Sequence, residues 1–160
     1  LTQMEAGASY KETLETAQKL GYAEADPTMD VEAWDPVAKI TILANVVMGG
    51  NLRVKDVERR GITSITTEEI KAAQREGKRI KLIAKAWRED KEIKAKVSPE
   101  KVPLTDVLAH IGGTLNALTF DTDVLKEVTI AGRGAGGIEA GYALLSDMLA
   151  INRYLGGKMG

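Results

Sequence analysis

The sequence predicts an α+β fold in which N-terminal helices are followed by a mostly antiparallel sheet and a long C-terminal helix. Up to about residue 77, apolar residues recur at helical spacing behind capping residues. From Lys78 onward, apolar residues alternate with lysines, as in strands that have one solvated face. Because helices and strands occupy separate stretches of the chain, the α+β class is favoured over an alternating α/β fold.

Two of the predicted helices carry the same start and stop signals. Each begins at a capping box, in which the N-cap hydroxyl and a glutamate three residues later satisfy each other's backbone amides. Each ends at a glycine suited to the left-handed conformation. The residues are Ser9, Glu12 and Gly21 for the first helix, and Thr66, Glu69 and Gly77 for the second.

An acidic segment, GYAEADPTMDVEAWDPVAK (21–39), follows the first helix and is predicted to begin as a loop that contains Pro27. The next helix is expected to have Asp35 as its N-cap and Pro36 as its first residue. It extends to about Met48 and is apolar on nearly every side, which predicts burial. A short helix is expected near residues 54–60.

Four strands are predicted in the second half of the chain. RIKLIAKAW and EIKAKV flank the turn REDK as a hairpin, and TLNALTFDT and KEVTIAG add two strands. The closing stretch GIEAGYALLSDMLAINRYL has helical spacing. The long hairpin edge is expected to be paired or covered, although the lysines along it could equally protect a monomer. These lysines are Lys81, Lys85, Lys94 and Lys96.

Length and composition limit the function classes. A chain of 160 residues predicts one domain over residues 1–160. A net charge of −1, without a basic patch interleaved with aromatics, argues against a nucleic-acid partner. The absence of cysteine excludes disulfides and thiolate metal sites, and a single histidine excludes poly-histidine zinc sites. The apolar runs are too short to span a bilayer and no signal peptide is visible, so a cytoplasmic protein without a membrane partner is expected.

The stretch GRGAGG (132–137) satisfies the G-x-G-x-x-G pattern between a predicted strand and a predicted helix. Such glycines would let backbone amides approach a phosphate at the positive end of the helix. A dinucleotide-binding unit also needs a second parallel strand and an acidic residue about 20 positions further on, which the chain lacks. A tight turn that joins strand and helix is therefore favoured over a nucleotide contact.

The acidic segment has two interpretations. In the first, its carboxylates are solvated and Asp35 caps a helix. In the second, Lys39 is partly desolvated at the start of a buried helix, which suits it to exchanging protons near neutrality. Asp35 lies four residues before Lys39 on the same face, and the loop could bring Glu24 close. A cation beside two carboxylates would orient a small zwitterionic substrate and deliver a proton.

Other candidate residues carry weaker signals. An all-carboxylate magnesium site ranks below the zwitterion site, because Mg²⁺ usually needs substrate phosphates as well. His110 is expected at a surface or interface rather than in catalysis. Trp34 and Trp87 are expected as core or interface anchors rather than stacking platforms.

Three stretches of the sequence resemble the homoserine dehydrogenase family. LGYAEADPTMDVEAWDPVAKITILA resembles the family's signature segment, with G-Y-x-E-x-D-P, then D, then D-x-x-x-K at these spacings. VPLTDVLAHIGGTLNAL is similar to the family's P-L-A…N-A stretch, and GRGAGGIEAGYALLSDMLAI to its closing glycine segment and helix. The resemblance covers almost the whole chain, and the first motif is specific.

The resemblance implies an oxidoreductase that interconverts L-aspartate 4-semialdehyde and L-homoserine with NAD(H) or NADP(H), in threonine, methionine and isoleucine biosynthesis. Lys39 would donate the proton to the carbonyl oxygen. Glu24 and Asp35 would bind the amino acid, with Asp30 as an adjacent supporting carboxylate. By the same resemblance Gly21 and Gly136 would touch the cofactor near its nicotinamide end, and no metal is expected in this region.

The family's nucleotide-binding domain precedes the matched region, and so do a second catalytic lysine and the monovalent-cation site of some members. The chain is therefore expected to be the catalytic and dimerisation domain alone, inactive by itself and homodimeric. The last helix packs on the nucleotide-binding domain in the family, so its apolar face is expected to be partly uncovered here. That face includes Leu144, Leu145, Met148 and Leu149. The alternative is a small-molecule-binding or regulatory module that keeps the acidic pocket without chemistry.

Overall fold

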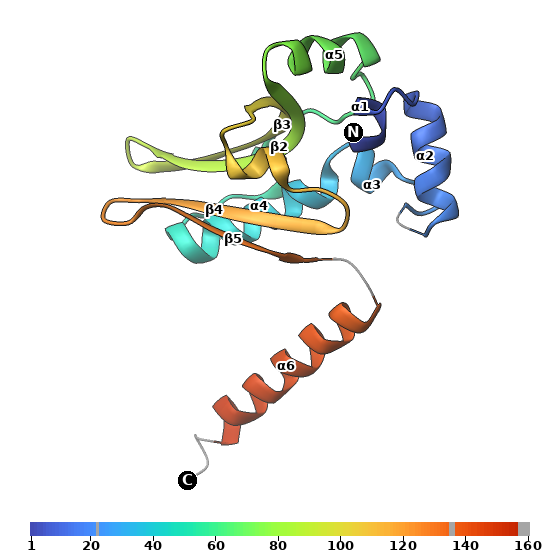
Figure 1. Cartoon of the computed structure of the whole chain (residues 1–160). Coiled ribbons are helices and arrows are strands. Elements are labelled where there is room, and N and C mark those ends of the chain that lie inside the picture. The colour runs from blue at the N-terminus through green and yellow to red at the C-terminus, as the bar shows by residue number, and fades with distance from the viewer. Residues whose placement is uncertain (22, 135–136, 157–160) are drawn as a thin grey trace. The chain divides into compact units, whose positions relative to one another are not determined.

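The structure is a computed structural model that describes residues 1–21, 23–134 and 137–156, and it divides into two compact units (Figure 1). Unit 1 is Leu1–Ala109 and unit 2 is His110–Gly160. Helices precede antiparallel strand pairs, and a long helix comes last, which confirms the predicted α+β class. The expectation of a single catalytic domain over residues 1–160 stays a prediction.

In its described residues, unit 1 contains five α-helices, two of which begin at the predicted capping boxes. They are α1 (Thr2–Glu5), α2 (Tyr10–Lys19), α3 (Thr28–Val31), α4 (Trp34–Met48) and α5 (Thr67–Arg75). Both predicted capping boxes are present. The hydroxyl of Ser9 accepts from the Glu12 amide at 3.2 Å, and that of Thr66 accepts from the Glu69 amide at 3.1 Å. Gly21 and Gly77 have φ of +73° and +69°, as expected of helix stops.

The predicted N-cap at Asp35 is wrong, because α4 already begins at Trp34. The residue before the helix is Ala33, which has a left-handed φ of 63° and a fully buried side chain. It joins α4 to α3, a one-turn helix inside the segment predicted as a loop. That turn starts where Asp26 Oδ1 accepts hydrogen bonds from the Thr28 amide at 3.1 Å and hydroxyl at 2.6 Å.

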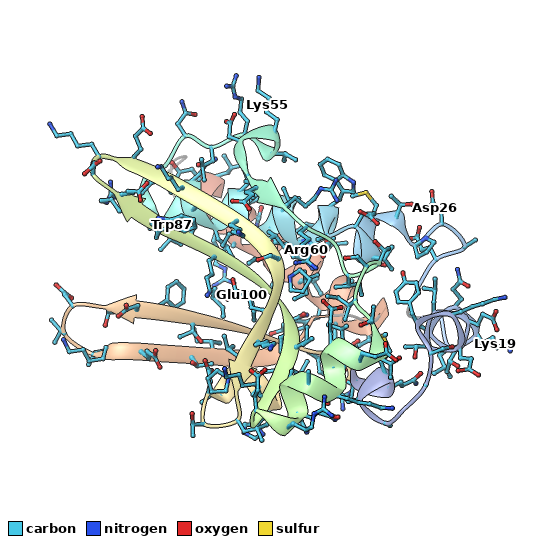
Figure 2. All side chains as sticks on the ribbon, turned by 90° about the horizontal axis from the view of Figure 1, so that it is seen from above. Lys19, Asp26, Lys55, Arg60, Trp87 and Glu100 are labelled. Atoms are coloured by element: carbon cyan, nitrogen blue, oxygen red, sulfur yellow. The ribbon has the colours of Figure 1, made fainter. Side chains whose placement is uncertain are left out.

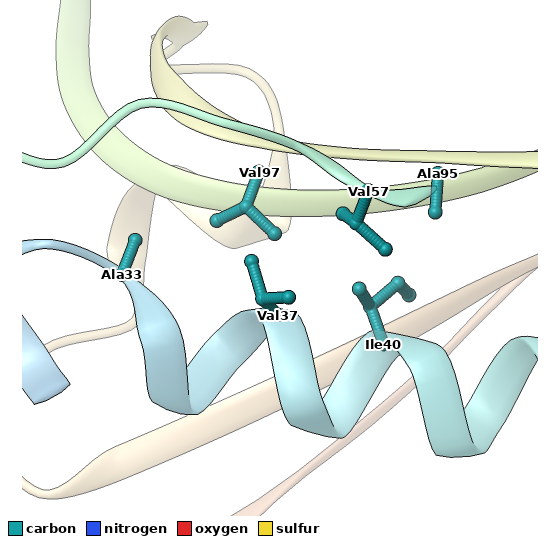
Figure 3. Close-up of a cluster of buried hydrophobic side chains, with 6 residues drawn as sticks. All are labelled: Ala33, Val37, Ile40, Val57, Ala95 and Val97. Carbon is teal, nitrogen blue, oxygen red and sulfur yellow. The ribbon is translucent and has the colours of Figure 1, made fainter. Parts of the chain in front are cut away.

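The helix α4 buries one face only, not nearly every side. Its buried residues Val37, Ile40, Thr41 and Ala44 follow the helical repeat that faces the sheet. Figure 3 shows two of them packed against side chains of the sheet strands, in a core of six residues. These are Ala33, Val37, Ile40, Val57, Ala95 and Val97. On the other side Ile42, Val46 and Val47 are exposed, because the sheet of unit 1 covers only one face of the helix.

The sheet of unit 1 has the order β1-β3-β2. Strands β2 (Lys78–Glu89) and β3 (Glu92–Pro103) form the predicted hairpin, in antiparallel register from Lys78↔Pro103 to Glu89↔Glu92. The short strand β1 (Glu58–Arg59) pairs parallel with β3. It follows a 3₁₀ turn, η1 (Val54–Asp56). The helix predicted near 54–60 is therefore limited to this turn, because Glu58 and Arg59 pair with β3 instead. Leu1–Ala109 has a second core cluster under α5, formed by Met4, Ile65, Ile70, Ala73 and Ile80.

Unit 2 has its own two-stranded sheet and the long helix. Strands β4 (Leu115–Thr122) and β5 (Lys126–Arg133) pair antiparallel with each other, in a sheet separate from that of unit 1. The helix α6 (Gly137–Gly156) follows. Its predicted apolar residues are 50 to 66% exposed, which confirms that they are partly uncovered: Leu144, Leu145, Met148 and Leu149. Within the described ranges, no helix has the length and apolarity needed to cross a membrane.

Candidate active site

The first part of the acidic segment is held by hydrogen bonds that involve the side chains of Gln18 and Asp26. Glu24 lies in the turn after α2, where the Gln18 side-chain amide donates to the Glu24 carbonyl at 3.0 Å. Asp26 is used by the start of α3, and its bonds from the Thr28 hydroxyl and amide lower the pKa of the Asp26 carboxyl. Asp26 is therefore a structural carboxylate, whereas Glu24 keeps its side chain exposed.

Lys39 and Asp35 form an ion pair across one turn of α4, with 2.7 Å between Lys39 Nζ and Asp35 Oδ2. The four-residue spacing predicted that they share a helix face, and the structure confirms it. The Asp35 side chain is 43% exposed and the Lys39 side chain 61% exposed. The expectation that Lys39 is partly desolvated is therefore wrong in this structure, because the lysine lies on the open side of α4.

Asp30 is the carboxylate whose pKa is affected by the other charged residues of the site. Asp30 is an exposed residue, but desolvation by neighbouring groups raises the pKa of its carboxyl, and the charges of Asp35 and Glu24 raise it further. The ammonium of Lys39 acts in the opposite direction. The four side chains come from the turn after α2, from α3 and from α4. Lys39 and Asp35 are in direct contact, and Asp30 is within range of the charges of Asp35, Glu24 and Lys39.

One of the two glycines predicted to touch a cofactor is among the described residues. Gly21 is exposed, and a Cβ built on it would meet no atom within 4 Å. Gly136 lies outside the described residues. Within GRGAGG, a Cβ on Gly134 would lie 1.8 Å from the Asn116 side-chain amide, and the Gly134 amide donates to the Thr114 carbonyl at 3.4 Å. The atom nearest to this position is the end of the exposed Asn116 side chain, which could move aside for a larger residue.

The remaining candidates from the sequence are His110, Trp87 and a metal site. His110 is exposed at the end of a 3₁₀ turn, η2 (Val107–His110). Trp87 is 39% exposed on β2. In the ranges that the structure describes, no group of three or more histidine or acidic side chains is arranged to hold a metal ion.

A cavity of about 280 Å³ opens on unit 1, but none of the predicted site residues lines it. Its lining comes from the segment before α5, from α5 itself and from the hairpin, and includes Arg60 and Glu100. Figure 2 shows both residues near the middle of the hairpin and Asp26 well to one side of them. The acidic site is therefore distinct from this cavity.

Sequence reasoning missed Arg59. Its guanidinium lies over the ring of Trp34, 4.0 Å from the centroid, and its Nη1 is 3.3 Å from Glu32 Oε2. Trp34 is 36% exposed and stacks with Arg59, so the expectation of a core anchor is wrong for it, and an interface role stays a prediction. Arg59 and Glu32 are 27 residues apart and belong to different elements, so no local spacing could have revealed their contact.

Comparisons with known proteins agree with the resemblance. Residues 1–149 match the family model described as homoserine dehydrogenase. A curated relative, the NAD(+)-dependent homoserine dehydrogenase of Pseudomonas canavaninivorans, is 43% identical over 96% of this chain and 44% of its own length. The chain thus spans less than half the length of the curated relatives it matches.

Solved structures give the same result. The homoserine dehydrogenase of Thiobacillus denitrificans matches with a TM-score of 0.91 and 32% identity, over 96% of this chain and 36% of the other. A hyperthermophilic archaeal homoserine dehydrogenase mutant, solved in complex with NADPH, matches with a TM-score of 0.74 and 27% identity, over 92% and 41%.

Proposed function

The chain belongs to the homoserine dehydrogenase family, and from this premise we propose that it is the substrate-binding and proton-transferring part of a longer enzyme. The reaction is the interconversion of L-aspartate 4-semialdehyde and L-homoserine with NAD(H) or NADP(H), in threonine, methionine and isoleucine biosynthesis. The observation that carries the proposal is the grouping of Glu24, Asp30, Asp35 and Lys39 at one surface of unit 1.

Lys39 is the proposed proton donor. Reduction of the aldehyde adds a hydride to the carbonyl carbon and leaves a negative charge on the oxygen, so a proton must reach that oxygen. The lysine ammonium can donate this proton and become a neutral amine, and in the reverse direction the neutral amine can take the hydroxyl proton as homoserine is oxidised. The Asp35 carboxylate lies one turn earlier on α4, 2.7 Å from Lys39 Nζ, and this ion pair orients the lysine side chain.

The carboxylates are proposed to bind the substrate's ammonium group. Glu24 and Asp35 come from two different elements, and the negative charge of each raises the pKa of the Asp30 carboxyl. A substrate ammonium placed there would relieve the repulsion among the three carboxylates, which supplies a reason for binding a cationic group. Asp30 supports this arrangement rather than binding the substrate directly.

The proposed cofactor contact on the described residues is Gly21. Its exposed backbone has no atom within 4 Å of a Cβ position, so a flat ring could approach the chain closely there. When bound, the nicotinamide cofactor would supply or accept the hydride. One relative is named as NAD(+)-dependent and one structural neighbour was solved with NADPH, so either cofactor is compatible with the family. Gly136 is proposed for the same role from the resemblance alone.

A non-catalytic binding module is the second candidate, and the exposure of Lys39 favours it. A lysine that is 61% exposed is an ordinary solvated cation until something covers it. In the proposed enzyme, the cofactor and its binding domain provide that cover. In a binding module, Lys39 would only neutralise the carboxylates.

We also propose a cytoplasmic homodimer formed through the sheet of unit 1. Within the described residues, the strand order β1-β3-β2 leaves the outer edge of the twelve-residue strand β2 without a partner strand. Lys96 was expected on the hairpin edge, but it lies on β3, which has a strand on each side at that point. Its Nζ is 2.7 Å from Glu58 Oε1. Lys85 is paired with Glu100. A monomer at micromolar concentration in sedimentation would contradict this part of the proposal.

The substrate assignment is tested by steady-state kinetics in the longer enzyme. Glu24→Gln and Asp35→Asn should raise KM for homoserine more than they lower kcat, because they remove partners of the bound ammonium. Glu15→Gln, an exposed acid on α2, is the matched control and should change neither constant. An unchanged KM for homoserine in both site variants would contradict the assignment.

A further inference from the structure

Arg59 is bound on two sides at the corner of the acidic segment. Its guanidinium stacks over the Trp34 ring at 4.0 Å, and it donates hydrogen bonds to the carbonyl and to the carboxylate of Glu32. The Arg59 side chain is 26% exposed. Its backbone is fixed in β1, where it pairs with Val97 of the central strand. The arginine therefore connects the sheet to the junction of α3 and α4.

The residues after Arg59 clasp the same junction. The Thr63 hydroxyl donates to Glu32 Oε1 at 2.8 Å, and the Ile62 amide donates to the Val31 carbonyl at 2.8 Å. At Gly61 the two segments are so close that a Cβ would lie 2.4 Å from the Val31 carbonyl oxygen. We call these contacts, from residues 59–63 to residues 31–34, the corner clasp.

The corner clasp lies between the parts of the proposed site. Asp30 belongs to α3, whereas Asp35 and Lys39 belong to α4. The two helices are joined through Glu32 and Ala33, and Ala33 has a left-handed φ of 63° that an alanine rarely adopts. Such a conformation persists when surrounding contacts hold it, and the clasp supplies contacts on both sides of it. The position of Asp30 relative to Asp35 depends on this junction.

We propose that Arg59 is a positioning residue that fixes the junction of α3 and α4, and so keeps Asp30 beside Asp35 and Glu24. The proposal deepens the proposed function and rests on it for the catalytic consequence. Arg59 touches no proposed substrate group, so it acts through Glu32 and Trp34. Arginine suits this role because its planar guanidinium can stack on a ring and bind an oxygen pair at once, which a lysine ammonium cannot do.

The test on this chain is the titration of the Asp30 carboxyl by NMR. In the wild type, Asp30 should titrate above an ordinary aspartate, because of desolvation and the charges of Asp35 and Glu24, with Lys39 opposing. Arg59→Lys keeps the charge but breaks the clasp, so the pKa of Asp30 should fall toward its ordinary value. Arg59→Gln should also lower it. Loss of a cation alone would raise the pKa of a nearby carboxyl, so the two effects have opposite signs.

Two further variants sharpen this experiment. Arg53→Lys makes the same change at an arginine that pairs with Asp56 in η1, outside the clasp, and should leave the Asp30 titration unchanged. Thr63→Ala removes one contact of Glu32 from an exposed position, so a result does not depend on the folding of Arg59 variants. It should lower the pKa of Asp30 less than Arg59→Lys does.

The result that overturns the proposal is an Asp30 titration that is ordinary in the wild type or unchanged in the Arg59 and Thr63 variants. In the longer enzyme, Arg59→Lys should also raise KM for homoserine about tenfold, since small misplacements of binding groups are costly. An inactive wild type would reject the proposed function, while the titration on this chain would still decide the role of Arg59.

Discussion

Asp26 and Asp30 lie four positions apart in one acidic segment but have opposite environments. Asp26 accepts two hydrogen bonds from Thr28, which lower the pKa of its carboxyl. Asp30 is also exposed, but desolvation by its neighbours and the charges of Asp35 and Glu24 raise the pKa of its carboxyl. One carboxylate therefore stabilises the fold in its charged form, and the other is kept charged at a cost in stability.

We expect Asp30→Asn to raise the stability of this chain at neutral pH. An acid whose pKa is raised in the folded state binds its proton more tightly there than in the unfolded state. Its ionised form therefore destabilises the fold, and the penalty grows as the pH rises from the ordinary value of 3.8 through the folded pKa. Urea unfolding at neutral pH should show a higher free energy of unfolding for the variant, and the difference should vanish below the ordinary pKa.

Asp26→Asn is the matched control, with the opposite sign. The lowered pKa of Asp26 means that its charged form contributes stability above the unfolded pKa, and that this contribution is lost as the pH falls through the folded pKa. The variant should be less stable than the wild type at neutral pH. Equal changes of the same sign in both variants would contradict the assigned environments.

At this scale, the sequence predicted contacts within one helix and missed those between elements. Asp35 and Lys39 are four residues apart, so helical geometry alone places them together. Arg59 meets Glu32 only because β1 pairs with β3 and α4 packs on the same sheet. The left-handed conformation of Ala33 was equally hidden, since alanine carries no signal for it.

The capping boxes of α2 and α5 have similar hydrogen bonds, but the helices that they start differ in how many buried residues they carry. The α5 helix buries Ile70 and Ala73, whereas no residue of α2 is buried. A cap stabilises the whole fold only when the helix it starts is coupled to the core. The two helices therefore form a natural comparison of the same motif in two contexts.

We expect Thr66→Ala to lower the free energy of unfolding by about 1 kcal/mol, the usual value of a lost N-cap. Ser9→Ala should cost less, because fraying of α2 exposes no buried residue. Asp35→Ala should show no cap loss, since Asp35 is not the N-cap of α4. Urea midpoints of the three variants would check the ranking, and a larger loss for Ser9→Ala than for Thr66→Ala would contradict it.

Elements whose signals are local were predicted well. Capping boxes, glycine stops and the alternation of β2 and β3 are set by neighbouring residues, and these features were confirmed. The short strand β1 was not predicted, because it exists only through its pairing with β3. The one-turn helix α3 was also missed, although Asp26 and Thr28 give it a local start. The burial of α4 was overpredicted because its sequence does not say how many faces are covered.

Across the whole molecule, the described chain presents unusual apolar surface. Large residues of α6 are exposed along its length, including Ile138, Tyr142 and Tyr154. Exposed apolar patches of this kind mark surfaces that are covered in an assembly. In the proposed enzyme, the nucleotide-binding domain and the dimer partner would supply that cover, which agrees with the chain spanning less than half of its relatives.

We expect this chain alone to show no dehydrogenase activity and to bind NAD(P)H weakly or not at all. Within the described residues it offers Gly21 as a proposed cofactor contact, without a parallel strand–helix unit for the dinucleotide. Titration calorimetry on the purified chain tests this directly. Micromolar binding of NAD(P)H would show that the chain carries a dinucleotide site of its own.

The central claim is that Lys39 delivers the proton that accompanies hydride transfer. Steady-state kinetics of Lys39→Ala in the longer enzyme test it most directly, with the melting temperature measured on the same samples. We expect kcat to fall roughly 10²- to 10⁴-fold, the usual contribution of a positioned general acid. Lys39→Arg should not restore turnover, because a guanidinium keeps its proton near neutral pH. A Lys39→Ala enzyme that folds normally and keeps a near wild-type kcat would contradict the claim.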